Sequence, residues 1–214
     1  MRSMHLRMQW KNRYTRSIEG IMNPYEPRQA AVKEVIVETP NIRTFVLEPK
    51  PMLSFQAGQF IELSVPGVGE APFTPSSSPY ELKNIEVTVM KVGRVTSDLF
   101  DVRPGDTLAV RGPYGVAYAL DAYENRHVLL VGGGVGMAPL RSLFLALIHN
   151  INAYKKVHLY YGARTSKDIV YDRLFKHWKN LKNIEIRRSI DIGEKGWKEE
   201  VGVVTVLLDN LPFK

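Results

Sequence analysis

The sequence predicts a small antiparallel β-barrel followed by an α/β domain built on a parallel sheet. Two observations carry this prediction. Short β-rich runs separated by proline, glycine and asparagine fill roughly residues 28–120, which is typical of an antiparallel barrel or sandwich. After Asn125, strand patterns alternate with helical patterns, and this alternation indicates a parallel sheet with crossover helices.

The first half of the chain contains the β-rich runs. They are the segment holding Val32, Val35 and Val37, followed by 43–47 (RTFVL), 59–65 (QFIELSV), 85–92 (IEVTVMKV) and 107–111 (TLAVR). Residues 1–24 precede them and show no sustained apolar period, so we expect a disordered or extraneous extension there. We therefore place a barrel domain at residues 25–122 and an α/β domain at residues 123–214.

The second half alternates between the two kinds of element. Leu140, Leu143, Phe144 and Leu147 recur at helical spacing, which predicts a helix over 139–148. The other elements that we expect are strands at 127–131, 157–161 and 184–190 and helices at 169–178 and 203–208.

Composition excludes several classes of function. The chain has no cysteine, which excludes disulfides, thiolate catalysis and any iron–sulfur or zinc site built on its own thiolates, and is consistent with a cytoplasmic location. No apolar run approaches the roughly 20 residues of a membrane-spanning helix. The formal net charge is +7, but much of it falls in residues 1–21, which argues against a nucleic-acid-binding face on the folded part.

A glycine-rich bend, VGGGVGMAP, joins the strand at 127–131 to the helix at 139–148. Gly132, Gly134 and Gly136 allow a phosphate to approach the backbone N–H groups at the helix start, and Pro139 suits its first turn. Met137 stands where the usual dinucleotide fingerprint has its last glycine, and the next strand does not end in an acidic residue. A tight turn with no ligand remains the alternative.

From about Tyr25 onward the chain resembles the ferredoxin reductase-like flavoproteins, which pair an FAD-binding barrel with a nicotinamide-nucleotide domain. The family motif G-x-G-x-A-P is matched by residues 134–139, GVGMAP. The resemblance implies that NAD(P)H contacts this loop and two later ones. The residues concerned are Gly132, Gly134, Gly136, Ala138, Pro139, Gly162, Ala163, Arg164 and Asp191. Arg164 either faces a 2′-phosphate, points to solvent or caps a helix, so the choice between NADH and NADPH stays open.

The family's flavin motif, Arg-x-Tyr-Ser/Thr, is matched in part by residues 71–74, APFT. The resemblance implies that Phe73 packs against the isoalloxazine and that the Thr74 hydroxyl lies near its N5, with Pro75 as a further cofactor-binding residue. Ala71 cannot replace the arginine that meets the FAD pyrophosphate. The alternative is that PFTPSSSP is a plain polar turn.

A second flavin element of the family, G-x-V-S/T-S/T, is matched by residues 93–97, GRVTS. It implies contacts to the diphosphate from Gly93, Val95, Thr96 and Ser97, and Thr96 is also a plausible N-cap for a helix over 97–100. The segment 111–115, RGPYG, resembles the element that ends the family's barrel, and we interpret it as structural.

Within this family the chain is most similar to electron-transfer subunits: the gamma subunits of soluble hydrogenases and sulfhydrogenases, and the B subunit of anaerobic sulfite reductase. The resemblance implies hydride transfer between NAD(P)H and FAD, and single-electron transfer with iron–sulfur centres in partner subunits of a hydrogenase- or reductase-type complex. It implies no catalytic acid–base pair, and we expect no metal site among the dispersed histidines. The alternatives are a stand-alone NAD(P)H:flavin or dye reductase and a non-catalytic nucleotide-binding remnant.

Two pieces of the family pattern are missing from this sequence. They are a strand bearing Cys-Gly-Pro beside the nicotinamide, and a cysteine-rich [2Fe-2S] segment. We therefore expect a truncated or split member whose nicotinamide pocket is incomplete. We also expect an uncovered sheet edge or core face, which a partner chain would cover.

Overall fold

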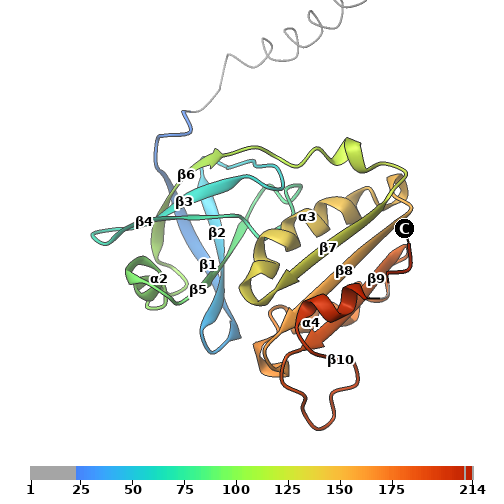
Figure 1. The fold of residues 1–214 in the computed structure, drawn as a ribbon. Coiled ribbons are helices and arrows are strands. Elements are labelled where there is room, and N and C mark those ends of the chain that lie inside the picture. Colours follow the sequence, from blue (N-terminus) through green and yellow to red (C-terminus); the bar gives the residue numbers. More distant parts are fainter. Residues whose placement is uncertain (1–22, 210, 214) are drawn as a thin grey trace, which may run out of the picture.

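Two sheets of different kinds lie side by side in the computed structural model, which describes residues 23–209 and 211–213 (Figure 1). The first sheet is antiparallel and the second is parallel, as the sequence predicts. Most of the N-terminal extension expected at residues 1–24 falls outside the described residues. Among the described residues, no helix is both long and apolar enough to cross a membrane.

The antiparallel sheet has the strand order β4-β3-β6-β1-β2-β5. Its strands are β1 (Arg28–Thr39), β2 (Ile42–Lys50), β3 (Phe60–Val65), β4 (Gly69–Phe73), β5 (Ile85–Met90) and β6 (Thr107–Tyr114), and the helix α2 (Arg94–Leu99) follows β5. Alternate residues such as Phe45, Leu47, Ile61 and Leu63 point inward and are fully buried, and they form the core of this barrel half.

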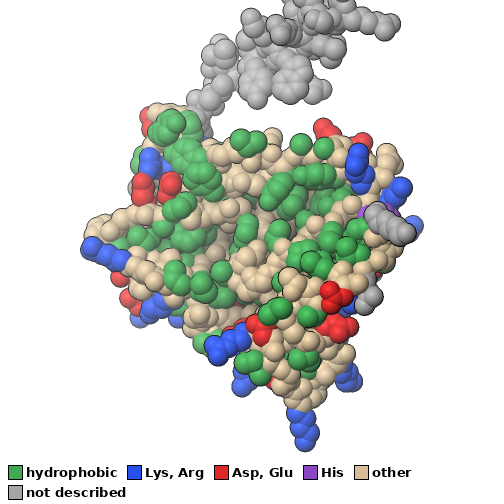
Figure 2. Space-filling model, in the orientation of Figure 1, with side chains coloured by type: hydrophobic (Ala, Val, Ile, Leu, Met, Phe, Trp, Pro, Cys, Tyr) green, Lys and Arg blue, Asp and Glu red, His purple; other side chains and the backbone are tan. Residues whose placement is uncertain are grey.

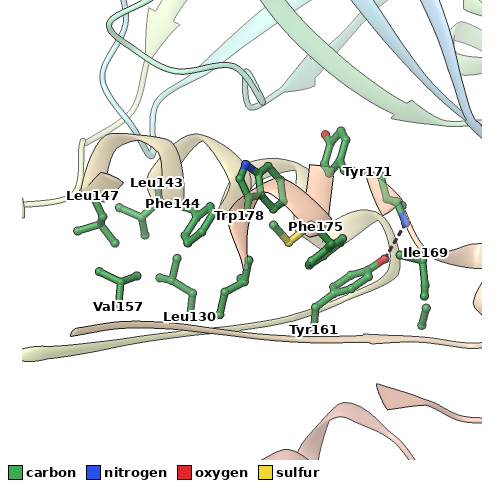
Figure 3. Close-up of a cluster of buried hydrophobic side chains, with 14 of the residues drawn as sticks. Leu130, Leu143, Phe144, Leu147, Val157, Tyr161, Ile169, Tyr171, Phe175 and Trp178 are labelled. Carbon is green, nitrogen blue, oxygen red and sulfur yellow. Dashed lines mark hydrogen bonds between the residues drawn. The ribbon is translucent and has the colours of Figure 1, made fainter. Parts of the chain in front are cut away.

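The parallel sheet has the order β10-β9-β8-β7, and α3 and α4 pack on one face of it. The elements are η1 (Leu120–Tyr123), β7 (His127–Gly133), η2 (Gly134–Gly136), α3 (Met137–His149), η3 (Ile151–Ala153), β8 (Lys156–Ala163), η4 (Ser166–Asp168), α4 (Asp172–Trp178), β9 (Ile184–Ile190), β10 (Glu200–Val201) and η5 (Val204–Leu208). Figure 3 shows Phe144, Phe175 and Trp178 descending from the helices onto Leu130 and Val157 of the strands.

Two of the expected helices differ from the structure. The helix expected over 169–178 begins only at Asp172, because Tyr171 takes a left-handed backbone conformation (φ +63°) that interrupts any helix through it. The segment expected as a helix over 203–208 is the short 3₁₀ helix η5. The strand β4 was not expected; it contains Pro72, but it lies at the sheet edge, where proline is tolerated.

One long edge of the parallel sheet is open. Among the described residues, β7 pairs only with β8, and a groove of about 440 Å³ runs along its other side. Backbone and side chains of residues 126–131 line this groove together with Tyr118, Tyr123, Leu140 and Leu143. Figure 2 shows hydrophobic side chains gathered over this side of the molecule.

Candidate functional site

The parallel sheet brings the predicted nucleotide-binding residues to one edge. Gly133 of β7 pairs with Gly162 of β8, and Ala163 pairs with Ile190 of β9, so the three strands end at the same level. The glycine loop, Arg164 and Asp191 follow directly after these ends. In open α/β sheets, ligands bind in the crevice outside the carboxyl ends of the strands.

The glycines of the loop serve two different purposes. A Cβ on Gly134 (φ +51°) or on Gly136 would meet no atom within 4 Å, so the loop leaves open space above its backbone. A Cβ on Gly132 would lie 2.4 Å from Leu140 Cδ1, so this glycine lets α3 pack closely on β7. Met137, at the position of the missing glycine, is fully buried and anchors the first turn of α3 in the core.

Tyr161 supports the loop from below, and sequence reasoning missed this role. Its hydroxyl donates to the Gly134 carbonyl oxygen at 3.1 Å and accepts the Val170 N–H at 3.2 Å; Figure 3 shows the second bond as a dashed line. Burial raises the pKa of Tyr161 to about 12, so the hydroxyl stays a neutral donor at physiological pH. The loop conformation is thus fixed by the core beneath it.

The second predicted loop is only partly exposed. Gly162 is buried, and a Cβ there would lie 2.7 Å from Val204 Cβ, so this glycine admits η5 to the sheet face opposite α3. Ala163 is also buried. Arg164 and Asp191 are exposed, and no hydrogen bond or ion pair of the Arg164 side chain is found with the described residues. Their contacts with a nucleotide stay predictions.

The predicted flavin residues lie on and after β4. Ala71 pairs with Leu63 of β3 and is half-buried, while Phe73 packs against the barrel core. Thr74 is half-buried, its hydroxyl has no hydrogen-bond partner among the described residues, and Pro75 is buried. Phe73 and Thr74 are both half-buried, and their contacts with a flavin stay predictions.

The element at residues 93–97 forms the start of α2. The Thr96 hydroxyl accepts the N–H groups of Val92 (3.0 Å) and Gly93 (2.8 Å). Thr96 is therefore not the N-cap that the sequence suggested: the helix begins at Arg94, and Thr96 reaches back from its third position. Backbone N–H groups of the first turn, such as those of Arg94 and Val95, have no partner within the helix.

The charges around β4 differ from those of the family motif. Arg111 pairs with Glu70, and its hydrogen bond is the main cause that holds the pKa of the Glu70 carboxyl below its usual value. Arg111 is thereby committed to holding β6 and β4 together, which agrees with its structural interpretation. Ala71 offers no cation to a phosphate, so the residues fit the ring of a flavin better than its diphosphate.

No group of three or more potential metal ligands occurs among the described residues. His127 and His158, 31 positions apart in sequence, are nevertheless adjacent, with His127 Nδ1 3.1 Å from His158 Nε2. Both rings contact Phe213, and the pair lies at the amino ends of the strands, at the edge opposite the glycine loop.

Comparison with known proteins identifies both halves. The chain matches the family model described as "Oxidoreductase FAD-binding domain" over residues 29–118 and the one described as "Oxidoreductase NAD-binding domain" over residues 130–211. It is 36% identical over 176 residues to the sulfhydrogenase 1 gamma subunit of Pyrococcus furiosus, covering 78% of this chain and 60% of that subunit. It is 33% identical over 210 residues to the sulfhydrogenase 2 gamma subunit of the same organism, covering 90% of this chain and 72% of that subunit.

The fold agrees with these sequence matches. The structure superposes on the crystal structure of the Amycolatopsis cytochrome P450 reductase GcoB with a TM-score of 0.74 and 26% identity, over 87% of this chain and 58% of that one. The chain spans 60% and 72% of the lengths of the two sulfhydrogenase subunits. By its two domains, its glycine loop and these matches, the chain belongs to the ferredoxin reductase-like family of oxidoreductases, which combine an FAD-binding domain with an NAD-binding domain.

Proposed function

We propose that this chain is an electron-transfer flavoprotein subunit that moves reducing equivalents between NAD(P)H and iron–sulfur centres of partner subunits. One observation carries the proposal: an open glycine cradle and a segment presenting an aromatic ring and an available hydroxyl lie on two halves that are joined by direct hydrogen bonds. The similarity to sulfhydrogenase gamma subunits supports a partner complex of the hydrogenase or reductase type.

Under this proposal the α/β half binds the nicotinamide nucleotide and the barrel half binds the flavin. The loop at Gly134 and Gly136, with the N–H groups at the start of α3, would hold the pyrophosphate of the nicotinamide nucleotide. Phe73 and Thr74 would hold the flavin ring, and the first turn of α2 its diphosphate. Bound FAD supplies the chemistry, which is acceptance of a hydride and release of electrons one at a time. The chain itself binds, orients and excludes water.

A visible spectrum taken under anaerobic conditions tests this function. The purified chain is loaded with FAD, desalted, and mixed with NADH or NADPH. Retained flavin that bleaches supports the proposal, and the nucleotide with the faster reaction identifies the specificity. Retained flavin that stays oxidised with both nucleotides contradicts hydride transfer by this chain. A chain that retains no FAD even at excess flavin contradicts the flavoprotein assignment.

A stand-alone reductase is the competing function. A stand-alone reductase should oxidise NADH in the steady state with free flavin or a soluble dye, and adding a partner protein should not increase the rate. An electron-transfer subunit instead predicts slow turnover with free flavin and faster oxidation of the bound flavin by a one-electron acceptor. Measuring both reactions on the same preparation separates the two functions.

A further inference from the structure

A buried cluster of polar side chains, the junction, connects the barrel half to the α/β half. It consists of Glu38, Thr44, Ser76, Glu86 and Thr88 from the barrel half and Arg141 and Tyr171 from the α/β half. Thr44, Ser76 and Tyr171 are fully buried, and the Glu38 side chain is only 2% exposed. Each of these side chains has a hydrogen-bond partner across or within the cluster, although the buried Nε of Arg141 has none among the described residues.

A chain of hydroxyl groups crosses the junction, and its direction is fixed. Thr44 donates to Glu38 Oε1 at 2.9 Å, because a carboxylate only accepts. Thr44 has then used its hydrogen, so Thr88 donates to Thr44 at 2.8 Å. Thr88 has used its own in turn, so the Tyr171 hydroxyl donates to Thr88 Oγ1 at 2.5 Å. Figure 3 shows the Tyr171 hydroxyl pointing away from the aromatic cluster and toward the barrel.

Glu38 closes this series of hydrogen bonds into a ring. Its Oε2 accepts the Tyr171 N–H at 3.1 Å and a hydrogen bond from Arg173 at 2.6 Å. Tyr171 is thus held at both its backbone and its hydroxyl by groups of the other half. The left-handed backbone of Tyr171 is rare for a bulky residue and persists only where the surroundings fix it.

Arg141 makes a second connection beside the ring. Its Nη1 donates to the Ser76 carbonyl oxygen at 3.1 Å and to the Glu86 carboxylate. Its guanidinium lies over the Tyr171 ring at 4.8 Å from the centroid. The Arg141 side chain is only 10% exposed, so these bonds form in a largely water-free environment, where they are stronger than on the surface.

The junction lies between the two candidate sites. Ser76 comes two residues after Thr74 of the flavin segment, and Arg141 belongs to α3, the helix that begins at the glycine loop. The loop element η2 also lies against β5, the strand that carries Glu86 and Thr88. The junction therefore connects the segment that carries the predicted flavin residues to the helix that begins at the glycine loop.

We propose that Arg141 and Tyr171 are positioning residues that fix the nicotinamide ring against the flavin ring for hydride transfer. This inference rests on the proposed function. Hydride transfer needs the reacting atoms about 3–3.5 Å apart, and a misplacement of about 1 Å can cost about a hundredfold in rate. The junction supplies that precision through short, directional bonds between the halves.

The first test measures flavin reduction by stopped flow on the FAD-loaded chain at saturating nucleotide. Tyr171→Phe removes only the hydroxyl, and Thr88→Val removes its acceptor without changing shape. Tyr160→Phe is the matched control, because Tyr160 is equally buried but its hydroxyl contacts Glu185 within the α/β half. We expect the rate constant to fall at least about tenfold in both junction variants and less than about twofold in the control, with the Kd of FAD and of the nucleotide unchanged.

A second pair of variants addresses Arg141. Arg141→Met should lower the reduction rate constant as Tyr171→Phe does, and Arg141→Lys should recover part of it, because a lysine still reaches one acceptor. Equal rate constants in the junction variants and in Tyr160→Phe would overturn the inference. So would losses that trace wholly to weaker binding of FAD or nucleotide.

A readout without cofactor keeps the inference separate from the proposed function. In the chain without FAD, Tyr171→Phe should speed amide hydrogen exchange at residues 74–80 and 137–149 relative to Tyr160→Phe. If wild-type flavin is never reduced by nucleotide, the proposed function fails. In that case unchanged exchange in the junction variants would overturn the junction's role in holding the two sites together, and faster exchange would show that the junction couples the two segments although no hydride is transferred.

Discussion

The two halves of the molecule hold their candidate sites in opposite ways. The glycine loop of the α/β half rests on its core: Tyr161 bonds the Gly134 carbonyl, and Leu140 fills the space beside Gly132. The predicted flavin residues of the barrel half lie on and after an edge strand, β4, and at the start of a six-residue helix, α2. The comparison teaches that the glycine loop is held by bonds and packing from the core of its own half, whereas the predicted flavin residues lie on peripheral elements.

The two candidate sites also differ in their charged side chains. The glycine loop needs no side-chain cation, because it offers backbone N–H groups at the end of a thirteen-residue helix. The cradle at β4 has the Glu70–Arg111 pair and no basic residue at position 71. We therefore expect binding of the nucleotide to be robust and binding of FAD to be the weaker of the two.

The largest effect is expected from Gly136→Val. The backbone of Gly136 (φ −60°) accepts any residue and a Cβ there meets nothing, so the fold is retained. The added side chain would fill the space for a phosphate, and loss of a charge-assisted hydrogen bond should weaken nucleotide binding about a hundredfold. Isothermal titration measures the Kd of the nucleotide, and the Kd of FAD should not change.

The matched control for this variant is Ala122→Val, which adds the same branched side chain at an exposed position of η1. It should leave both dissociation constants unaltered. Unchanged nucleotide affinity in Gly136→Val would show that the loop is a plain turn with no ligand, which is the alternative that the sequence left open.

A smaller effect of opposite sign is expected from Ala71→Arg. The new guanidinium would supply the cation that the flavin motif of the family has at this place, and a charge-assisted bond to the FAD pyrophosphate should tighten FAD binding about tenfold. Fluorescence titration of FAD measures the change. Ala122→Arg adds the same charge elsewhere, and a similar gain in that control would mean that overall charge, and not the site, attracts the cofactor.

Much of this architecture could be predicted from local sequence patterns. The strand at 127–131, the helix at 139–148 and the strand at 184–190 each follow from apolar spacing that the structure confirms. Where an element differs from the prediction, a contact with a residue far away in the sequence is the cause. Tyr171 breaks the helix expected over 169–178 because Glu38, 133 positions away, holds its backbone N–H.

The candidate site could be predicted only in part for the same reason. The glycines of the loop and the residues that follow the strand ends can be recognised in the sequence by their type and position. Arg141 gave a weak signal, as one charged residue within a largely apolar helix, and its acceptors Ser76 and Glu86 lie 65 and 55 positions away. Pairings at such separation are set by how the two halves pack, which no local pattern records.

The smallest effect expected is a loss of stability of the α/β half in mild acid. The described histidines, His127, His149, His158 and His177, all lie in this half, and only His158 is fully buried. Burial is the main cause that lowers the pKa of His158 below 6.5; Lys156 and His127 lower it further, and Glu185 opposes them. As the pH falls below about 6.5, the unfolded chain therefore binds more protons than the folded chain. The free energy of unfolding decreases over this range, until the pH drops below the pKa of His158 in the folded protein.

Urea unfolding followed by tryptophan fluorescence measures this loss, because Trp178 and Trp197 both lie in the α/β half. The midpoint should be lower at about pH 5.5 than at about pH 7.5, and His158→Leu should flatten that dependence by removing the titrating group. His177→Gln, at an exposed position, should keep the wild-type dependence. A dependence as steep in His158→Leu as in the wild type would contradict the assignment of the acid sensitivity to His158.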